Sequence, residues 1–301
     1  MKKVCYFTSK LSTDIRIFEK ECTSLAKAGY EVYLVSPNTK EEIRRGVHIV
    51  NVTYLKKGFF HNVFTLPKLL YKKALSINAD IYHFNDPGSL RYVSKLKKKG
   101  KKVIFDSFED HPTLLFEKKS IPFPLIYLLS KIYSAYEYYK SKELDGLILC
   151  YHWTQDRLSK ACENNKLIFN FPVLSKNIIK KENNSKNTIC YTGLISNIWK
   201  IENILSAIVR FKDLKFNLAG NGPNDNYNEK LKSNEGWKKV NNFGIIKHEE
   251  VYGKILSQSN IGIALLDYLP LCKGNVGNLS NNKLFEYMRA GLPVIVTDFI
   301  L

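Results

Sequence analysis

The chain has 301 residues, of which 45% are hydrophobic and 25% are charged, and its formal net charge is +18 at pH 7. This composition is typical of a globular protein and excludes a disordered chain, and no apolar run approaches the roughly 20 residues that a bilayer-spanning helix needs. The positive charge would suit nucleic acid, anionic lipid or a diphosphate substrate, although a lysine-rich solvated surface accounts more simply for any single basic run.

The N-terminus and the cysteines indicate the compartment. The apolar region after Met1 is too short for a secretory signal. The six cysteines are scattered without a Cys-x-x-Cys pair, and several fall in strand-like runs. We therefore expect reduced, buried cysteines and a cytoplasmic protein.

The first half of the chain alternates predicted strands with predicted helices. Strands are expected at 3–9, 31–37, 47–55, 80–86 and 102–110, and helices at 15–30, 65–78 and 89–100. This alternation predicts a parallel, doubly wound sheet, whose ligands bind beyond the carboxyl ends of the strands. The polar residues expected at those ends are His83, Asn85, Asp86, Asp106, Glu109 and Asp110.

Residues 121–139 form the most apolar segment, which prolines and charged residues interrupt. We interpret it as an aromatic amphipathic helix that either packs on the core or lies at a membrane surface. Strands expected at 145–151 and 166–173 close this half, and the polar stretch 175–186 is the predicted linker.

A second series of strands and helices follows the linker. Strands are expected at 187–193, 215–223, 240–244 and 261–267, and helices at 200–212, 226–235 and 248–259. Two similar halves predict two Rossmann-like domains, at 1–174 and 187–301, with a cleft between them.

The segment 280–299 is the most informative one. A polar cluster precedes a short predicted helix in which Leu284, Phe285 and Met288 share a face, and a buried strand follows. Free backbone N–H groups at such a helix start can hold a phosphate, and Glu286, a turn further in, could accept two ribose hydroxyls. An ordinary αβ unit with a surface glutamate fits the local pattern equally well.

Other motifs are weaker. Gly193 and Lys200, after a predicted strand, could hold a phosphate, and Gly220 could form the floor of a nucleotide pocket, but a purely structural turn is the commoner explanation. The glycines do not make the G-x-G-x-x-G fingerprint of an NAD site. No histidine or cysteine spacing indicates a metal, and His83 on an apolar strand is more often a packed core histidine than a catalyst.

Several blocks of the first half resemble glycosyltransferase family 4, whose members are retaining enzymes. Residues 13–36 are similar to the opening segment of the family, in which Asp14 and Arg16 match and would face the acceptor side of the cleft. The segment 80–87 matches at His83 and Asp86. The segment 101–112 matches at Asp106 and Glu109, but Phe108 replaces a histidine that lies near the donor sugar in the family. The resemblance implies His83, Asp86 and Glu109 as catalytic residues.

The second half carries the resemblance further. Gly193 and Lys200 are similar to the glycine and basic residue that hold the donor diphosphate, while Leu194 stands where an arginine is common. Glu286 matches the ribose-binding glutamate, and Asn278 replaces the other glutamate of the family's pair. Asn282 and Lys283 fit the Asn-Lys-Leu-Phe-Glu-Tyr-Met string of a branch that builds bacterial surface polysaccharides. We therefore expect Gly193, Lys200, Gly220, Asn282, Lys283 and Glu286 to bind the donor.

The resemblance implies a GT-B fold, in which two Rossmann-like domains face each other across a cleft. It also implies transfer of a sugar from a nucleotide-sugar donor to a hydroxyl of a lipid-linked glycan, without metal or cofactor, at the inner face of the membrane or in the cytoplasm. Family members continue past the position of Leu301, so the second domain is expected to be incomplete.

Two alternatives remain beside this hypothesis. A sugar-nucleotide epimerase shares the GT-B architecture. A truncated protein that binds the donor without turnover is suggested by Phe108, Asn278 and the early end of the chain. Nucleic-acid binding rests on net charge alone, so no nucleic-acid partner is expected.

Overall fold

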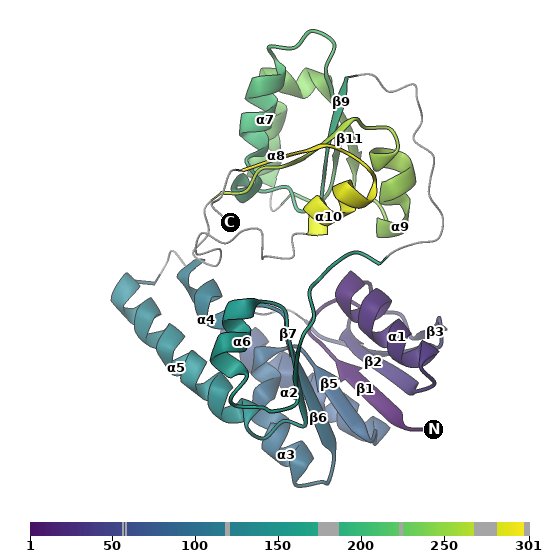
Figure 1. The fold of residues 1–301 in the computed structure, drawn as a ribbon, viewed down its shortest axis with the longest axis vertical. Helices are drawn as coiled ribbons and strands as arrows, with labels where there is room; N and C mark the ends of the chain where they lie inside the picture. The colour runs from purple at the N-terminus through teal and green to yellow at the C-terminus, as the bar shows by residue number, and fades with distance from the viewer. Residues whose placement is uncertain are drawn as a thin grey trace. The chain divides into compact units, whose positions relative to one another are not determined.

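The computed structural model describes residues 1–55, 57, 59–117, 121–173, 187–222, 225–267 and 282–297. The chain divides into two compact units, Met1–Phe169 and Asn170–Leu301, which Figure 1 colours from purple to teal and from teal to yellow. The predicted linker 175–186 lies outside the described residues.

The first unit is built on one eight-stranded sheet. In order across the sheet, the strands are β3 (Glu42–Arg44), β4 (Val47–Val52), β2 (Glu31–Pro37), β1 (Lys3–Phe7), β5 (Ile81–Phe84), β6 (Lys102–Ser107), β7 (Gly146–Leu149) and β8 (Asn165–Leu167). All pairs are parallel except β3 with β4. The strand order reverses between β1 and β5, which is the doubly wound pattern that the alternation predicted.

Helices cover both faces of this sheet, as a parallel sheet requires. They are η1 (Ile15–Cys22), α1 (Thr23–Lys27), α2 (Phe59–Ile77), η2 (Pro87–Tyr92), α3 (Val93–Lys97), α4 (His111–Leu114), η3 (Leu115–Glu117), α5 (Phe123–Ser141) and α6 (His152–Leu158). Successive residues of β1 enter different cores: Tyr6 belongs to the cluster that contains Ile17 of η1, and Phe7 belongs to the cluster that contains Leu70 of α2.

Two expectations in this unit need correction. The strand expected at 166–173 is shorter: β8 spans Asn165–Leu167, where it pairs with β7, and Ile168 N adds a hydrogen bond to Leu149 O. The helix expected at 15–30 begins at Ile15, but its first eight residues are wound as a π-helix and the α-helix ends at Lys27.

The second unit contains a five-stranded sheet that is parallel throughout. Its strands, in order, are β11 (Val240–Gly244), β10 (Lys215–Ala219), β9 (Thr188–Thr192), β12 (Ile261–Ala264) and β13 (Val294–Val296). Its helices are η4 (Asn197–Trp199), α7 (Ile201–Ile208), α8 (Asp225–Lys232), η5 (Glu235–Lys239), α9 (His248–Val251), η6 (Tyr252–Leu256) and α10 (Asn282–Arg289). The order reverses between β9 and β12, so this sheet is also doubly wound.

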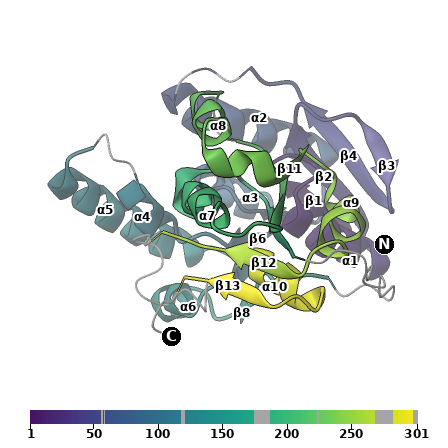
Figure 2. The same cartoon turned by 90° about the horizontal axis from the view of Figure 1, so that it is seen from above.

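The buried side chain of α10 is not one of those that the periodicity predicted. Tyr287 is fully buried, whereas Met288 is 60% exposed. The Tyr287 ring lies against Gly262 of β12, where a Cβ would come within 2.4 Å of the ring, and its hydroxyl accepts a hydrogen bond from Thr192 N at 3.0 Å. Figure 2 shows α10 beside β12 and β13. The missing Cβ of Gly262 therefore determines which face of α10 turns inward.

Candidate functional site

The strand-order reversal of the first unit lies between β1 and β5, where a ligand is expected. Ser9, two residues after β1, donates from its backbone N–H and its hydroxyl to Asp86, two residues after β5. Burial raises the pKa of the Asp86 carboxyl, and the Ser9 hydrogen bonds oppose that rise. The hydrogen bonds between Ser9 and Asp86 therefore join the loop after β1 to the loop after β5.

A buried ion pair lies beside this gap. Arg16 donates from Nε to Asp106 Oδ2 at 2.7 Å and from a terminal nitrogen to Oδ1 at 2.8 Å. The Arg16 side chain is 6% exposed and that of Asp106 is 0% exposed. Asp14 places Arg16 by capping η1, because its carboxylate accepts a hydrogen bond from Ile17 N at 3.1 Å. Both residues predicted for the acceptor side thus fix the start of this helix.

Glu21 and His83 complete the buried cluster. Glu21 lies 3.2 Å from Arg16 Nε, and its other carboxylate oxygen lies 3.5 Å from His83 Nε2. Burial, reinforced by the charge of Asp106, raises the pKa of Glu21 well above its usual range. Burial lowers the pKa of His83 to about 4, so its imidazole is neutral at pH 7. The catalytic role predicted for His83 stays a prediction, and Glu21 was not named from the sequence.

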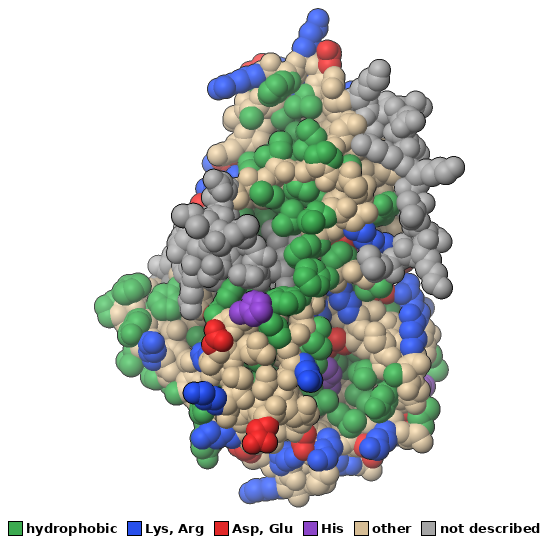
Figure 3. Space-filling model, viewed as in Figure 1, with side chains coloured by type: hydrophobic (Ala, Val, Ile, Leu, Met, Phe, Trp, Pro, Cys, Tyr) green, Lys and Arg blue, Asp and Glu red, His purple; other side chains and the backbone are tan. Residues whose placement is uncertain are grey.

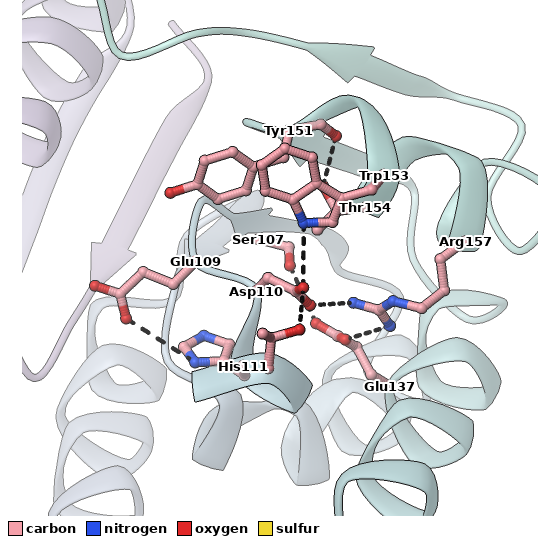
Figure 4. A network of polar contacts seen from close by, with 10 residues as sticks. Ser107, Glu109, Asp110, His111, Glu137, Tyr151, Trp153, Thr154 and Arg157 are labelled. Carbon is pink, nitrogen blue, oxygen red and sulfur yellow. Dashed lines mark hydrogen bonds and ion pairs between the residues drawn. The ribbon is translucent and has the colours of Figure 1, made fainter. Parts of the chain in front are cut away.

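Glu109 lies on a more open part of the same edge. Its carboxylate is 3.3 Å from Lys10 Nζ and 3.9 Å from His111 Nδ1, and Figure 4 shows the contact with His111. Phe108 has its ring centroid 5.6 Å from Lys10 Nζ and 5.4 Å from the Arg16 guanidinium. Two cations thus lie near the same aromatic ring.

A polar network attaches this edge to α5 and α6 (Figure 4). Asp110 accepts hydrogen bonds from Trp153 Nε1 at 3.1 Å and from Arg157 at 3.4 Å. Arg157 also donates to Glu137 Oε2 at 2.7 Å, and Ser107 donates to the other oxygen of Glu137 at 3.1 Å. The sequence analysis did not name Glu137. A carboxylate in a helix as apolar as α5 could have indicated it, because a buried carboxylate needs a polar partner.

In the second unit, two glycines bring strand ends into contact. Gly193 follows β9 with φ +127°, and Gly220 follows β10 with φ +154°. A Cβ on Gly220 would lie 1.7 Å from the carbonyl oxygen of Gly193. Only glycine fits at position 220. The backbone of the two glycines carries no side chains, and such backbone is the kind of surface that a phosphate can approach.

Lys283 lies against this glycine pair. A Cβ on Gly193 would lie 2.5 Å from Lys283 Cε. The ammonium is 3.4 Å from the centroid of Trp199 and 5.4 Å from that of Tyr191. Burial lowers the pKa of Lys283 to about 7. A cation is therefore held beside Gly193 by aromatic faces, in surroundings that disfavour its charge.

Lys200 and Asp267 lie on the two sides of the strand-order reversal. Lys200 lies between η4 and α7 in the left-handed conformation, with φ +50°. Its Nζ lies 2.7 Å from the carboxylate of Asp267, which follows β12. The backbone N–H of Asp267 also donates to Ile198 O at 2.7 Å. The predicted diphosphate-binding lysine is thus engaged with a carboxylate in this structure.

Glu286 is 15% exposed and faces two basic side chains. Its oxygens lie 3.3 Å from His248 Nε2 and 3.6 Å from an Arg289 nitrogen. Asn282 begins α10 and is exposed. Asn278 and the polar cluster before α10 lie outside the described residues. The ribose-binding role of Glu286 stays a prediction.

Within the described ranges, no group of three His, Cys, Asp or Glu side chains could hold a metal ion. Among the same residues, no helix combines the length and apolarity that crossing a bilayer demands.

Comparison with known proteins establishes the fold. No protein-family profile and no curated protein sequence matches the chain. Solved structures match it over 98% of its length: sucrose-phosphate synthase from Thermosynechococcus elongatus (TM-score 0.68, 14% identity, 81% of that chain), WaaG, a glycosyltransferase involved in lipopolysaccharide biosynthesis (0.65, 11%, 80%), and Anabaena HepE in complex with UDP and glucose (0.62, 10%, 80%). The predicted GT-B fold of two Rossmann-like units is therefore confirmed, and its structural neighbours are glycosyltransferases.

The raised pKa of Glu21 predicts a pH-dependent stability. An unfolded glutamate ionises near pH 4.3, whereas folded Glu21 keeps its proton to higher pH. Above pH 4.3 the folded state binds more protons, so this group's contribution to stability falls as pH rises. We expect the free energy of unfolding of the wild type, measured with urea, to fall relative to that of Glu21→Gln between pH 4.5 and 7.5. Glu163→Gln, at an exposed position, is the control; a pH-independent difference for Glu21→Gln would contradict the assignment.

The lowered pKa of Lys283 predicts the opposite slope. Above about pH 7 the folded state has lost a proton that the unfolded state keeps to about pH 10.4, so stability rises with pH. Between pH 7.5 and 9.5 the wild type should gain up to about 1.4 kcal/mol per pH unit relative to Lys283→Met. Urea unfolding measures this difference, with Lys247→Met, at an exposed position, as the control. Parallel pH profiles of wild type and Lys283→Met would refute a buried, neutral amine.

Proposed function

We propose that the protein is a retaining glycosyltransferase of family 4, which transfers a sugar from a nucleotide-sugar donor to a hydroxyl of a lipid-linked glycan in surface polysaccharide synthesis. The observation that carries the proposal is the group of residues at the strand-order reversal of the second unit. There, the close contact of Gly193 with Gly220 leaves this stretch of backbone without side chains, and the Lys283 side chain lies directly against Gly193.

The donor diphosphate would exchange partners with the cations that surround this backbone. Lys200 now contacts Asp267, and the ammonium of Lys283 now lies on Trp199. A diphosphate beside Gly193 offers both cations a stronger partner, because charge-assisted hydrogen bonds to phosphate are stronger than contacts to an aromatic face. These cations would also stabilise the negative charge that develops on the leaving diphosphate as the glycosidic bond breaks.

Glu286 would accept hydrogen bonds from the two ribose hydroxyls. Its carboxylate is partly accessible, and its contacts with His248 and Arg289 hold it in place as an acceptor. The donor nucleotide is proposed to be a uridine diphosphate, since the similar structure of HepE is a complex with UDP and glucose.

The first unit would supply the acceptor side and the catalytic groups. Asp86 and Glu109 lie at the carboxyl edge of its sheet, beside Ser9 and Lys10 respectively. The His83 ring packs on that of Tyr6, with centroids 4.4 Å apart, and His83 would act there as a neutral imidazole.

Binding of the donor without turnover is the second candidate, and Phe108 favours it. The ring lies between Lys10 and Arg16 at the position where the family carries a histidine. A phenyl ring can neither donate nor accept a conventional hydrogen bond to a donor sugar. Release of free UDP from UDP-glucose in the presence of acceptor would exclude this candidate, whereas tight UDP binding without release would support it.

The ribose contact predicts a loss of donor affinity in Glu286→Ala. Two hydrogen bonds to a charged carboxylate are worth about 1.5–3 kcal/mol each, so the Kd for UDP should rise about 100-fold or more. Isothermal titration calorimetry measures the Kd, and sugar transfer should be abolished in parallel. Glu249→Ala, which removes an exposed carboxylate at the start of α9, is the matched control. It should leave UDP binding and sugar transfer unchanged. Unaltered UDP binding and transfer by folded Glu286→Ala would refute the assignment.

The membrane association that we propose rests on α5. The face of this helix that packs on the unit carries Ile126, Ser130, Glu137 and Ser141. Its exposed face is apolar instead: Phe123, Leu125, Tyr127, Leu128, Leu129, Ile132 and Tyr139 are 37–69% exposed. Figure 3 shows hydrophobic side chains gathered at the N-terminal end of α5, at the left of the view. Exposed Lys131 and Lys142 accompany them and would favour an anionic bilayer surface.

The apolar face of α5 predicts binding to vesicles. The protein should float with vesicles that contain phosphatidylglycerol, and Leu125→Glu combined with Leu128→Glu should weaken binding by about tenfold or more, since each buried leucine side chain contributes about 1.5–3 kcal/mol. Ile245→Glu, at an apolar position of the second unit that is 75% exposed, is the control. Equal flotation of all three proteins would argue against α5 as the contact.

A further inference from the structure

A cavity of the first unit carries a concentration of positive charge. It measures about 410 Å³ and is lined by Lys68, Tyr71, Lys72, Arg91, Tyr92 and Lys95. One wall is α2, and the other is the continuous segment η2–α3. The volume is within the range of small-molecule sites.

The floor of this cavity is aromatic and rigid. The rings of Tyr71 and Tyr92 stack with centroids 4.2 Å apart and planes 4° from parallel. Both side chains belong to the main core of the unit and are 9% and 8% exposed. The floor can therefore receive the flat or apolar part of a ligand without rearrangement.

The charge of the cavity is not compensated by the protein. Residues 59–77 and 87–97, which form both walls, contain no aspartate or glutamate. Among the described residues, no ion pair joins Lys68, Lys72, Arg91 or Lys95 to a carboxylate. Four like charges around one cavity repel each other, and an anion within it would relieve that repulsion.

Arg91 is held in place by neutral groups. Its guanidinium donates to Gly88 O at 2.7 Å and to Val63 O at 3.2 Å, and it lies 4.8 Å from the ring centroid of Phe64. These contacts fix the position of the cation without reducing its charge, so less side-chain entropy is lost when an anion binds.

We propose that this cavity is a binding site for a phosphate group whose ligand also covers the Tyr71–Tyr92 floor. Lysine and arginine side chains without acidic partners are the usual ligands of phosphate, and an aromatic floor adds area for the remainder of the ligand. The phosphate can belong to a phosphomonoester lipid such as phosphatidic acid or to a soluble phosphate ester, because both present a terminal phosphate group.

The site is separate from the proposed donor site, which lies in the other unit. Within the first unit, Arg91 and Lys95 lie one and two turns along the helical segment that starts after Asp86. Lys140 of α5 donates to Ser94 Oγ of α3 at 2.8 Å, so the segment also packs on the helix with the exposed apolar face. A headgroup in the cavity would thus bind close to the C-terminal part of that helix.

The test compares two double variants of the full chain. Lys68→Gln with Lys95→Gln removes two cavity charges and leaves Arg91, which supports backbone carbonyls, in place. Lys73→Gln with Lys99→Gln removes two exposed charges on α2 and directly after α3, outside the cavity, and is the matched control. Inorganic phosphate and pyrophosphate, titrated by calorimetry, probe a soluble ligand. Vesicles of phosphatidylcholine with or without phosphatidic acid probe a headgroup.

The cavity variant should bind one of these two kinds of probe about tenfold more weakly than the control, which should stay within about twofold of wild type. A loss confined to vesicles with phosphatidic acid identifies a lipid headgroup, and a loss with the inorganic probes identifies a soluble ester. Binding at the proposed donor site and at α5 is common to all three proteins, so it cancels in the comparison. Equal losses in both double variants, or no loss in either, would overturn the proposal.

Discussion

The bidentate pair between Arg16 and Asp106 is the interaction on which the carboxyl edge of the first unit depends. It joins the first turn of η1 to the end of β6, residues separated by 90 positions in the chain. Because both groups are buried, removing one partner would leave an unpaired charge, at a typical cost of about 3–5 kcal/mol. The same guanidinium contacts Glu21 and the ring of Phe108. The positions of the neighbouring candidate residues therefore follow from this one pair.

The second unit reaches a comparable arrangement by close backbone approach instead of buried charge. At the strand-order reversal, Gly193 and Gly220 contact each other without side chains between them. The charged groups nearby, Lys200 and Asp267, pair with each other. Lys200 with Asp267 is partly exposed, and such pairs contribute little net stability, about 0–1 kcal/mol. A ligand with two phosphates could displace them at small cost, whereas the buried pair of the first unit would resist displacement.

The positive charge of the chain is unevenly used. Many lysines and arginines are matched by carboxylates, such as Lys97 with Asp145 and Arg157 with Glu137. The cavity between α2 and η2–α3 differs, since all the charged residues that line it are basic. Together with the apolar face of α5, this gives the first unit two surface features that its own core does not explain. Each is compatible with a ligand that combines negative charge and apolar area.

The sequence by itself determined the alternation of strands and helices, the two doubly wound units, and the polar residues at strand ends. These follow from local periodicity and from the parallel sheet, whose carboxyl ends meet at one edge. It also indicated Gly193 and Gly220, which follow strands of the second unit, as candidate donor-binding positions. Only the tertiary structure decided which partners those residues meet: Arg16 with Asp106, Lys283 with Trp199, and Tyr287 in place of Met288 as the buried residue of α10. Such pairs join distant segments, and a local pattern carries no information on the distance between them.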